Sequence, residues 1–217
     1  MQVAQTLDTI VQVSAKLDYL LHLPEGYAPD GPAWPLILFL HGAGERGDDL
    51  AKLRVNGIPR NIENQPDFPF IVASPQCPES SFWTQELLSL KALLDDLVAR
   101  YNVDESRIYL TGLSMGGFGT WHLACTCPER FAAIAPICGG LMGPAVLVSS
   151  LARVPTWVFH GGKDPVVDIE QSQRLVDQLE SVGGDVRFTI YPKAEHDSWT
   201  ETYDNAALYE WFLAHTL

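Results

Sequence analysis

Short apolar runs rich in β-branched and aromatic residues alternate with longer segments of helical periodicity, and this alternation restricts the possible folds more than any other feature. A strand followed by a helix and another strand is the repeating unit of a parallel sheet covered by helices on both faces. The expected strands cover residues 17–23, 35–41, 70–75, 107–112, 131–138, 156–161 and 186–191. The expected helices cover residues 87–101, 115–127, 169–183 and 205–215. The pattern therefore predicts an α/β fold with a mostly parallel central sheet.

Length and charge restrict the organisation and the partners. A chain of 217 residues has the size of one domain, so we expect a single domain over residues 1–217. The formal net charge of −13 disfavours binding to nucleic acid and to anionic membranes. No apolar run approaches the roughly 20 residues that cross a bilayer. Residues 1–20 lack the basic start and continuous apolar stretch of a secretory signal, so we expect a cytoplasmic location. The oligomeric state is left open.

Cysteine usage gives no indication of a disulfide framework or a metal site. We expect the four cysteines to be reduced and structural, because two of them are too close in sequence to bridge within a helix and no Cys/His cluster has a metal-site spacing. They are Cys77, Cys125, Cys127 and Cys138. We accordingly expect no metal and no cofactor.

The segment Gly112-Leu113-Ser114-Met115-Gly116 fits the pattern G-x-S-x-G, with an expected strand before it and an expected helix after it. A sharp strand-to-helix turn strains the backbone of the serine, and glycines on both sides allow neighbouring backbone to approach closely. This context predicts that Ser114 is presented at the top of the sheet as a nucleophile. The alternative is a glycine-rich turn with an incidental serine.

A serine nucleophile needs a base, and ligands of such sheets bind beyond the carboxyl ends of the strands. His196 is the best candidate, because it follows the last expected strand in a loop with Glu195 and Asp197. His41 and His160 also lie at strand ends, each before a glycine, where a histidine more often supports a tight loop than transfers protons. The remaining histidines, His22, His122 and His215, are expected to be structural or solvated.

An acid must fix the tautomer of the histidine. Asp164 lies in the glycine-rich loop after the strand TWVFHG, which gives the chain order Ser, Asp, His that this fold type uses. Asp168 is the alternative, although its position favours a role as the N-cap of the next helix.

Acyl transfer also needs hydrogen-bond donors for the developing oxyanion. We expect the backbone N–H groups of Met115 and Ala43 to supply them, with Gly42 and Gly44 as neighbouring alternatives to Ala43. Glu45 and Arg46 follow in the same HGAGERG loop, and the sequence leaves open whether they pair or reach substrate. Among aromatic residues near the expected rim, Trp83 and Trp199 are the candidate substrate contacts, with core or rim packing as the alternative.

Four motifs in order, YLLHLPEGYAPDGPAWPLILFLHGAGERGDD, GLSMGGFGTW, HGGKDPVV and YPKAEHDSW, cover residues 19–199. This arrangement resembles the lidless carboxylesterase/phospholipase branch of the α/β-hydrolases, which includes acyl-protein-thioesterase-like proteins, and the feruloyl-esterase and prolyl-oligopeptidase-like group described as predicted peptidases. The resemblance implies Ser114 as nucleophile, Asp164 and His196 as its partners, and the amides of Ala43 and Met115 as the oxyanion hole. It does not identify a branch, because the residue before the serine and Met115 vary between branches.

The reaction predicted from these residues is hydrolysis of a small or exposed carboxylic ester through an acyl-enzyme. A thioesterase and a serine peptidase use the same residues and are the alternatives, and a non-catalytic binding module is a third. The roughly 17 residues between the expected strands ending near Cys138 and starting near Thr156 are too few for a helical lid domain, so we expect an open site that favours short acyl chains.

Overall fold

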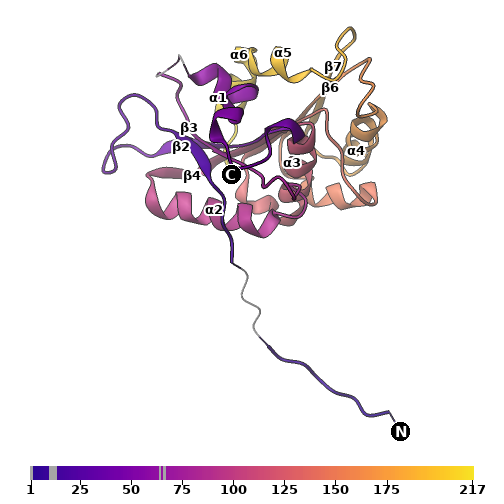
Figure 1. Ribbon diagram of the computed structural model, residues 1–217. Coiled ribbons are helices and arrows are strands. Elements are labelled where there is room, and N and C mark those ends of the chain that lie inside the picture. The colour runs from indigo at the N-terminus through magenta and orange to yellow at the C-terminus, as the bar shows by residue number, and fades with distance from the viewer. Residues whose placement is uncertain (1, 10–13, 64, 66) are drawn as a thin grey trace.

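Seven strands form one sheet in the order β1-β3-β2-β4-β5-β6-β7 (Figure 1). The computed structural model describes residues 2–9, 14–63, 65 and 67–217. The strands from β2 to β7 pair in parallel, and β1 pairs antiparallel with β3 at one edge. They are β1 (Tyr19–His22), β2 (Trp34–Leu40), β3 (Ile71–Pro75), β4 (Val103–Leu113), β5 (Ala133–Ile137), β6 (Thr156–Gly161) and β7 (Val186–Tyr191). The mostly parallel sheet expected from the sequence is confirmed.

Helices cover both faces of the sheet, and the alternation of side chains along β2 shows how the two layers divide. Leu36, Leu38 and Leu40 lie in one core with the first three long helices, whereas Ile37 and Phe39 lie in a second core on the other face. The first layer contains α2 (Leu87–Arg100), α3 (Met115–Thr126) and α4 (Glu170–Ser181). The second layer contains α1 (Gly57–Ile62), α5 (Trp199–Tyr203) and α6 (Ala206–Leu213).

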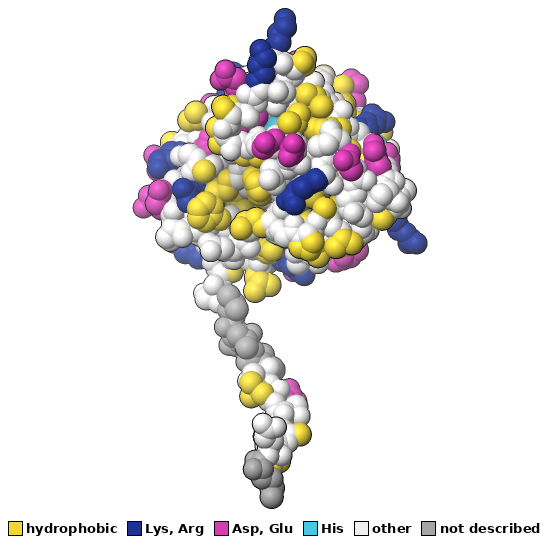
Figure 2. Space-filling view, turned by 90° about the vertical axis from the view of Figure 1, so that its right-hand side faces the viewer, with side chains coloured by type: hydrophobic (Ala, Val, Ile, Leu, Met, Phe, Trp, Pro, Cys, Tyr) yellow, Lys and Arg dark blue, Asp and Glu magenta, His cyan; other side chains and the backbone are white. Residues whose placement is uncertain are grey.

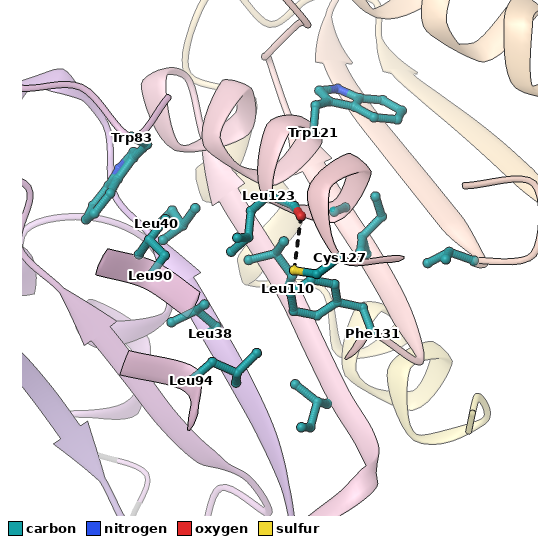
Figure 3. Packing of buried hydrophobic residues seen from close by; sticks show 14 of the residues in the cluster. Leu38, Leu40, Trp83, Leu90, Leu94, Leu110, Trp121, Leu123, Cys127 and Phe131 are labelled. Atoms are coloured by element: carbon teal, nitrogen blue, oxygen red, sulfur yellow. Dashed lines mark hydrogen bonds between the residues drawn. The ribbon is translucent and has the colours of Figure 1, made fainter. Parts of the chain in front are cut away.

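Figure 3 shows the first core between the sheet and its helices, with Leu38 and Leu110 of the strands opposite Leu90 and Leu94 of α2. These four side chains are at most 1% exposed.

Two differences from the expected elements have local causes. Residues 57–62 form α1 in a segment expected to be a loop, because a six-residue helix is too short to show a periodic apolar pattern. The helix expected over 205–215 is α6, and a further short helix that was not expected, α5, precedes it. The side chain of Asn205 accepts a hydrogen bond from the backbone N–H of Ala207, so it caps α6 and separates it from α5.

The connection between β5 and β6 carries one short 3-10 helix, Ala145–Leu151. Its buried residues Val148 and Leu151 pack into the first core, so the helix lies against the layer of α3 and α4. Of the helices within the described part of the chain, none has the length and apolar character needed to cross a membrane.

Candidate active site

Ser114 lies between the end of β4 and the start of α3, as the G-x-S-x-G pattern predicts. Its backbone has φ 53° and ψ −115°, a conformation that costs a residue with a Cβ about 1–3 kcal/mol. The flanking glycines are required by space: a Cβ on Gly116 would lie 1.9 Å from the carbonyl oxygen of Leu40, and one on Gly112 would lie 2.5 Å from the carbonyl oxygen of Gly116. The pattern thus allows β2, β4 and α3 to meet closely beneath the serine.

The structure brings Ser114, His196 and Asp164 into one hydrogen-bonded line. His196 Nε2 lies 2.9 Å from Ser114 Oγ, and His196 Nδ1 lies 2.7 Å from Asp164 Oδ2. Asp164 follows β6 and His196 follows β7, so three loops at the carboxyl ends of parallel strands supply the three side chains. With Asp164 accepting the Nδ1 proton, Nε2 is free to accept a proton from the serine hydroxyl.

The Asp164 carboxylate is fixed on both oxygens. Its side chain is 0% exposed, and Oδ1 accepts hydrogen bonds from the backbone N–H groups of Val166 at 2.8 Å and Val167 at 3.0 Å. Burial acts to raise the pKa of Asp164, but the hydrogen bonds from His196 and the two backbone amides outweigh it and hold the pKa below its ordinary value. The carboxylate therefore stays ionised beside the imidazole.

His160 is a second histidine at this carboxylate, a contact that was not predicted from the sequence. Its Nε2 lies 3.3 Å from Asp164 Oδ2 and 2.9 Å from the carbonyl oxygen of Val167, while Nδ1 lies 2.8 Å from Ser172 Oγ. Burial lowers the pKa of His160, so the ring is neutral and its Nε2–H faces the two oxygens. The His-Gly-Gly-Lys-Asp spacing was the available signal, since it places both residues on one strand-end loop.

Asp168, the alternative acid, lies outside this arrangement. Its side chain is exposed, and Oδ1 accepts a hydrogen bond from the backbone N–H of Glu170 at 2.9 Å, one residue before the N-cap position of α4 at Ile169. It stabilises the helix start, close to the role expected for it.

The HGAGERG loop orients the peptide between Gly42 and Ala43. His41 Nε2 accepts a hydrogen bond from the backbone N–H of Cys77 at 3.0 Å, so the ring proton is on Nδ1, which donates to the carbonyl oxygen of Gly42 at 2.5 Å. Because the peptide unit is planar and trans, the N–H of Ala43 points to the side opposite that carbonyl and away from the buried ring. Burial lowers the pKa of His41 to about 4, so the ring is neutral at pH 7 and Nε2 remains available as the acceptor for Cys77.

Ala43 and Met115 both stand at helix starts, where backbone N–H groups lack partners within the helix. Within the described ranges, neither N–H donates a hydrogen bond to a protein acceptor. Both remain candidate oxyanion donors.

Glu45 and Arg46, whose roles the sequence left open, point in different directions. Glu45 is 7% exposed, and its carboxylate accepts a hydrogen bond from Asn56 Nδ2 at 2.5 Å. The Arg46 guanidinium donates to the carbonyl oxygen of Ala43 at 3.1 Å and lies 4.7 Å above the ring centre of Phe82.

A cavity of about 390 Å³ lies against Met115, the residue that follows the serine. It is lined by Phe82, Trp83, Thr84, Gln85, Met115, Phe118 and Met142. Phe82 and Met142 are exposed, so the cavity opens to solvent through apolar side chains. Figure 2 shows hydrophobic side chains grouped on one face of the molecule, with acidic and basic side chains around them.

The two tryptophans expected to contact substrate have structural contacts of their own. Trp83 is 0% exposed and donates from Nε1 to the carbonyl oxygen of His41 at 2.9 Å, while its ring borders the cavity. The Trp199 ring packs edge to face on His196, with 5.2 Å between ring centres and 87° between planes.

Cys138 lies beside the same residues. Its Sγ, a carboxylate oxygen of Asp164 and a ring nitrogen of His196 all lie within 4.8 Å of one another. Burial raises the pKa of the Cys138 thiol to about 12, and His196 and Asp164 already hydrogen-bond each other. The proximity of Cys138 to these two side chains was not predicted from the sequence, which indicated only a structural role for this cysteine.

Known proteins share this fold and these sequence features. The chain is 29% identical over 205 residues to the bifunctional acetylxylan esterase/xylanase XynS20E of Neocallimastix patriciarum, an alignment that covers 89% of this chain and 28% of that protein. The crystal structure of a thermostable esterase superposes with a TM-score of 0.79 and 38% identity, over 93% of this chain and 60% of the other. That of esterase PE8 superposes with a TM-score of 0.68 and 25% identity, over 90% of this chain and 98% of the other.

The chain therefore spans less than a third of the length of the fungal relative and 60% of the thermostable esterase. The family model described as phospholipase/carboxylesterase matches residues 68–209, which include Ser114, Asp164 and His196. This match covers well over half of the chain and agrees with the sheet order and the strand-end site. The chain belongs to the phospholipase/carboxylesterase family and has the α/β-hydrolase fold.

Proposed function

We propose that the protein is a serine carboxylesterase that works through an acyl-enzyme intermediate. The observation that supports this most strongly is the hydrogen-bonded line from Ser114 Oγ through His196 to the buried Asp164. In this proposal Ser114 is the nucleophile, His196 the general base and acid, and Asp164 the group that fixes the His196 tautomer.

The reaction proceeds in two balanced halves. Ser114 Oγ attacks the ester carbonyl carbon and passes its proton to His196 Nε2, while the N–H groups of Ala43 and Met115 stabilise the oxyanion. The carbon–oxygen bond of the alcohol breaks, and the alcohol leaves with the proton from His196. Water then attacks the acyl-enzyme by the same route and releases the carboxylic acid and Ser114.

The open cavity beside Met115 supports small or exposed esters as substrates. Its walls are mostly apolar side chains, and the short 3-10 helix between β5 and β6 packs against the helical layer. Acetyl groups on a carbohydrate, the substrates named for the fungal relative, are one class of this kind.

A thioesterase is the second candidate. The chain is 27% identical over 104 residues to acyl-protein thioesterase 1 of Gibberella zeae. A serine activated by a histidine can attack a thioester carbonyl as it attacks an ester carbonyl. Peptidase activity and a purely binding role are outcomes that the experiment below separates.

The proposal is tested by labelling with a fluorophosphonate, followed by turnover of matched esters, thioesters and amides. We expect label on Ser114, ester turnover, and a loss of at least about a thousandfold in kcat for Ser114→Ala. Wild-type protein without label on Ser114 would refute the serine mechanism, and faster turnover of the amide or thioester would reassign the substrate class.

We also propose a cytoplasmic location and no affinity for nucleic acid or anionic lipid. These rest on the net charge of −13 and on four cysteines that are all free thiols. Fractionation of the native host and binding to anionic vesicles test the two parts separately.

A further inference from the structure

Glu45 is a buried carboxylate that the proposed reaction does not use. It belongs to the loop that holds the Ala43 amide, and burying an ionised carboxylate is costly unless donors face it. Its Oε1 accepts from Asn56 Nδ2 at 2.5 Å, and its Oε2 lies 3.8 Å from His41 Nδ1, which donates to Gly42 instead. The Asn56 amide is thus its closest donor among the described residues.

The other end of the Asn56 side chain reaches the opposite side of the site. Asn56 Oδ1 accepts a hydrogen bond from Trp199 Nε1 at 3.3 Å, and the Trp199 ring packs on His196. One amide therefore connects the oxyanion loop to the side chain that supports the general base, across 143 residues of sequence.

Asn56 makes these contacts instead of capping the helix that follows it. It occupies the N-cap position of α1, where an asparagine oxygen usually accepts from the first helical amides, yet it forms no such hydrogen bond. Its oxygen is directed to Trp199 instead, so the stabilisation that capping would give to α1 is forgone.

We propose that Asn56 is a positioning residue: by bridging Glu45 and Trp199, it sets the distance between the oxyanion amides and His196. This inference rests on the proposed function. The transition state has to reach the oxyanion amides and the His196 ring at once, and a misplacement of about 1 Å between such groups costs about a hundredfold in rate.

The first test compares Asn56→Ala with Asn61→Ala in the full chain. Asn61 lies in the same helix and also binds the α5–α6 region, donating to the Tyr203 carbonyl oxygen at 3.0 Å and to Asp204 Oδ1 at 2.9 Å. We expect Asn56→Ala to lower kcat at least about tenfold with KM changed less than about threefold, and Asn61→Ala to leave both near wild type.

The second test exchanges donor and acceptor. Asn56→Asp alone places two carboxylates against each other and should lower kcat by about a hundredfold. Adding Glu45→Gln restores a donor at position 45, while the new carboxylate at position 56 accepts from it and from Trp199 Nε1. We expect the double variant to recover at least about tenfold in kcat over Asn56→Asp, a rescue that general loosening of the fold would not produce.

Thermal unfolding is measured on every variant, and rates are compared at temperatures where all are folded. Equal kcat losses in Asn56→Ala and Asn61→Ala, an Asn56→Ala rate within twofold of wild type, or absence of rescue would overturn the positioning role. A wild-type protein that is neither labelled on Ser114 nor active on esters would instead refute the proposed function, so the two failures are distinguishable.

Discussion

The Asp164→Asn substitution tests the proposed reaction most directly, because the structure determines which way the new amide points. Asp164 Oδ1 accepts from the backbone N–H groups of Val166 and Val167, so only the amide oxygen fits at that position. The NH₂ group must then take the place of Oδ2, 2.7 Å from His196 Nδ1. An N–H donor at that point requires Nδ1 to be an acceptor.

The consequence is the wrong tautomer. With Nδ1 unprotonated, the proton is on Nε2, which faces Ser114 Oγ at 2.9 Å and can no longer remove its proton. In hydrolases with such a line of residues this change costs about 10⁴ in kcat, which corresponds to about 5.5 kcal/mol in the activation barrier. We expect a loss of that size, with a fold that stays intact.

The assay is kcat on a soluble aryl acetate at neutral pH, with thermal unfolding measured alongside. Asp168→Asn is the matched control, and because asparagine caps helices about as well as aspartate, it should cost less than about 1 kcal/mol of stability and leave kcat near wild type. Retention of more than about a tenth of wild-type kcat by Asp164→Asn would show that the tautomer argument is wrong. So would a larger loss in the control.

Three further outcomes follow from packing, burial and the cavity. Gly116→Ala places a Cβ 1.9 Å from the Leu40 carbonyl oxygen, so we expect it to destabilise the fold by at least about 2 kcal/mol although alanine favours helices, and an unchanged melting temperature would contradict this. His41 has a folded pKa of about 4 against about 6.5 unfolded. Between those two pKa values only the unfolded state binds the proton. The free energy of unfolding therefore decreases as the pH is lowered, by about 2 kcal/mol from pH 7.5 to pH 5. Denaturant titrations should show this decrease in wild type and a decrease smaller by about 2 kcal/mol in His41→Asn; equal decreases in the two proteins would refute it. On aryl esters, kcat/KM should peak between acetyl and hexanoyl, because each CH₂ left in water forgoes about 0.8 kcal/mol, whereas a peak at dodecanoyl would reveal a deeper pocket.

The parts of the site that the sequence predicted are those with a local signal. Ser114 lies between two glycines at the end of an apolar strand, and Asp164 and His196 follow two other strands, so each could be located without knowing the other two. A parallel sheet brings the carboxyl ends of its strands together, and this general rule supplied the proximity that no local pattern contains. The same reasoning predicted the sheet and the long helices.

The unpredicted parts depend on contacts between distant segments. The Asn56–Trp199 hydrogen bond joins the N-cap residue of α1 to the first residue of α5, and α1 has no periodic pattern to indicate it. Glu45 looks like an ordinary surface acid in the sequence, and only the folded chain shows that it is buried. Such contacts depend on how distant segments pack against one another, and this packing cannot be read from the residue types at individual positions.

The backbone of Ser114 has a consequence for how such a protein can change over evolutionary time. At φ 53° and ψ −115° the residue has a backbone conformation that glycine adopts at lower energy than serine. The fold is therefore less stable than it would be with glycine here, and in return it carries a hydroxyl at this position. Ser114→Gly and Ser114→Ala both abolish the hydroxyl, yet the glycine variant should be the more stable by about 1 kcal/mol, because alanine has a Cβ that this backbone conformation disfavours. If selection for activity were lost, glycine would therefore be favoured at this position, and an inactive descendant would have a more stable fold.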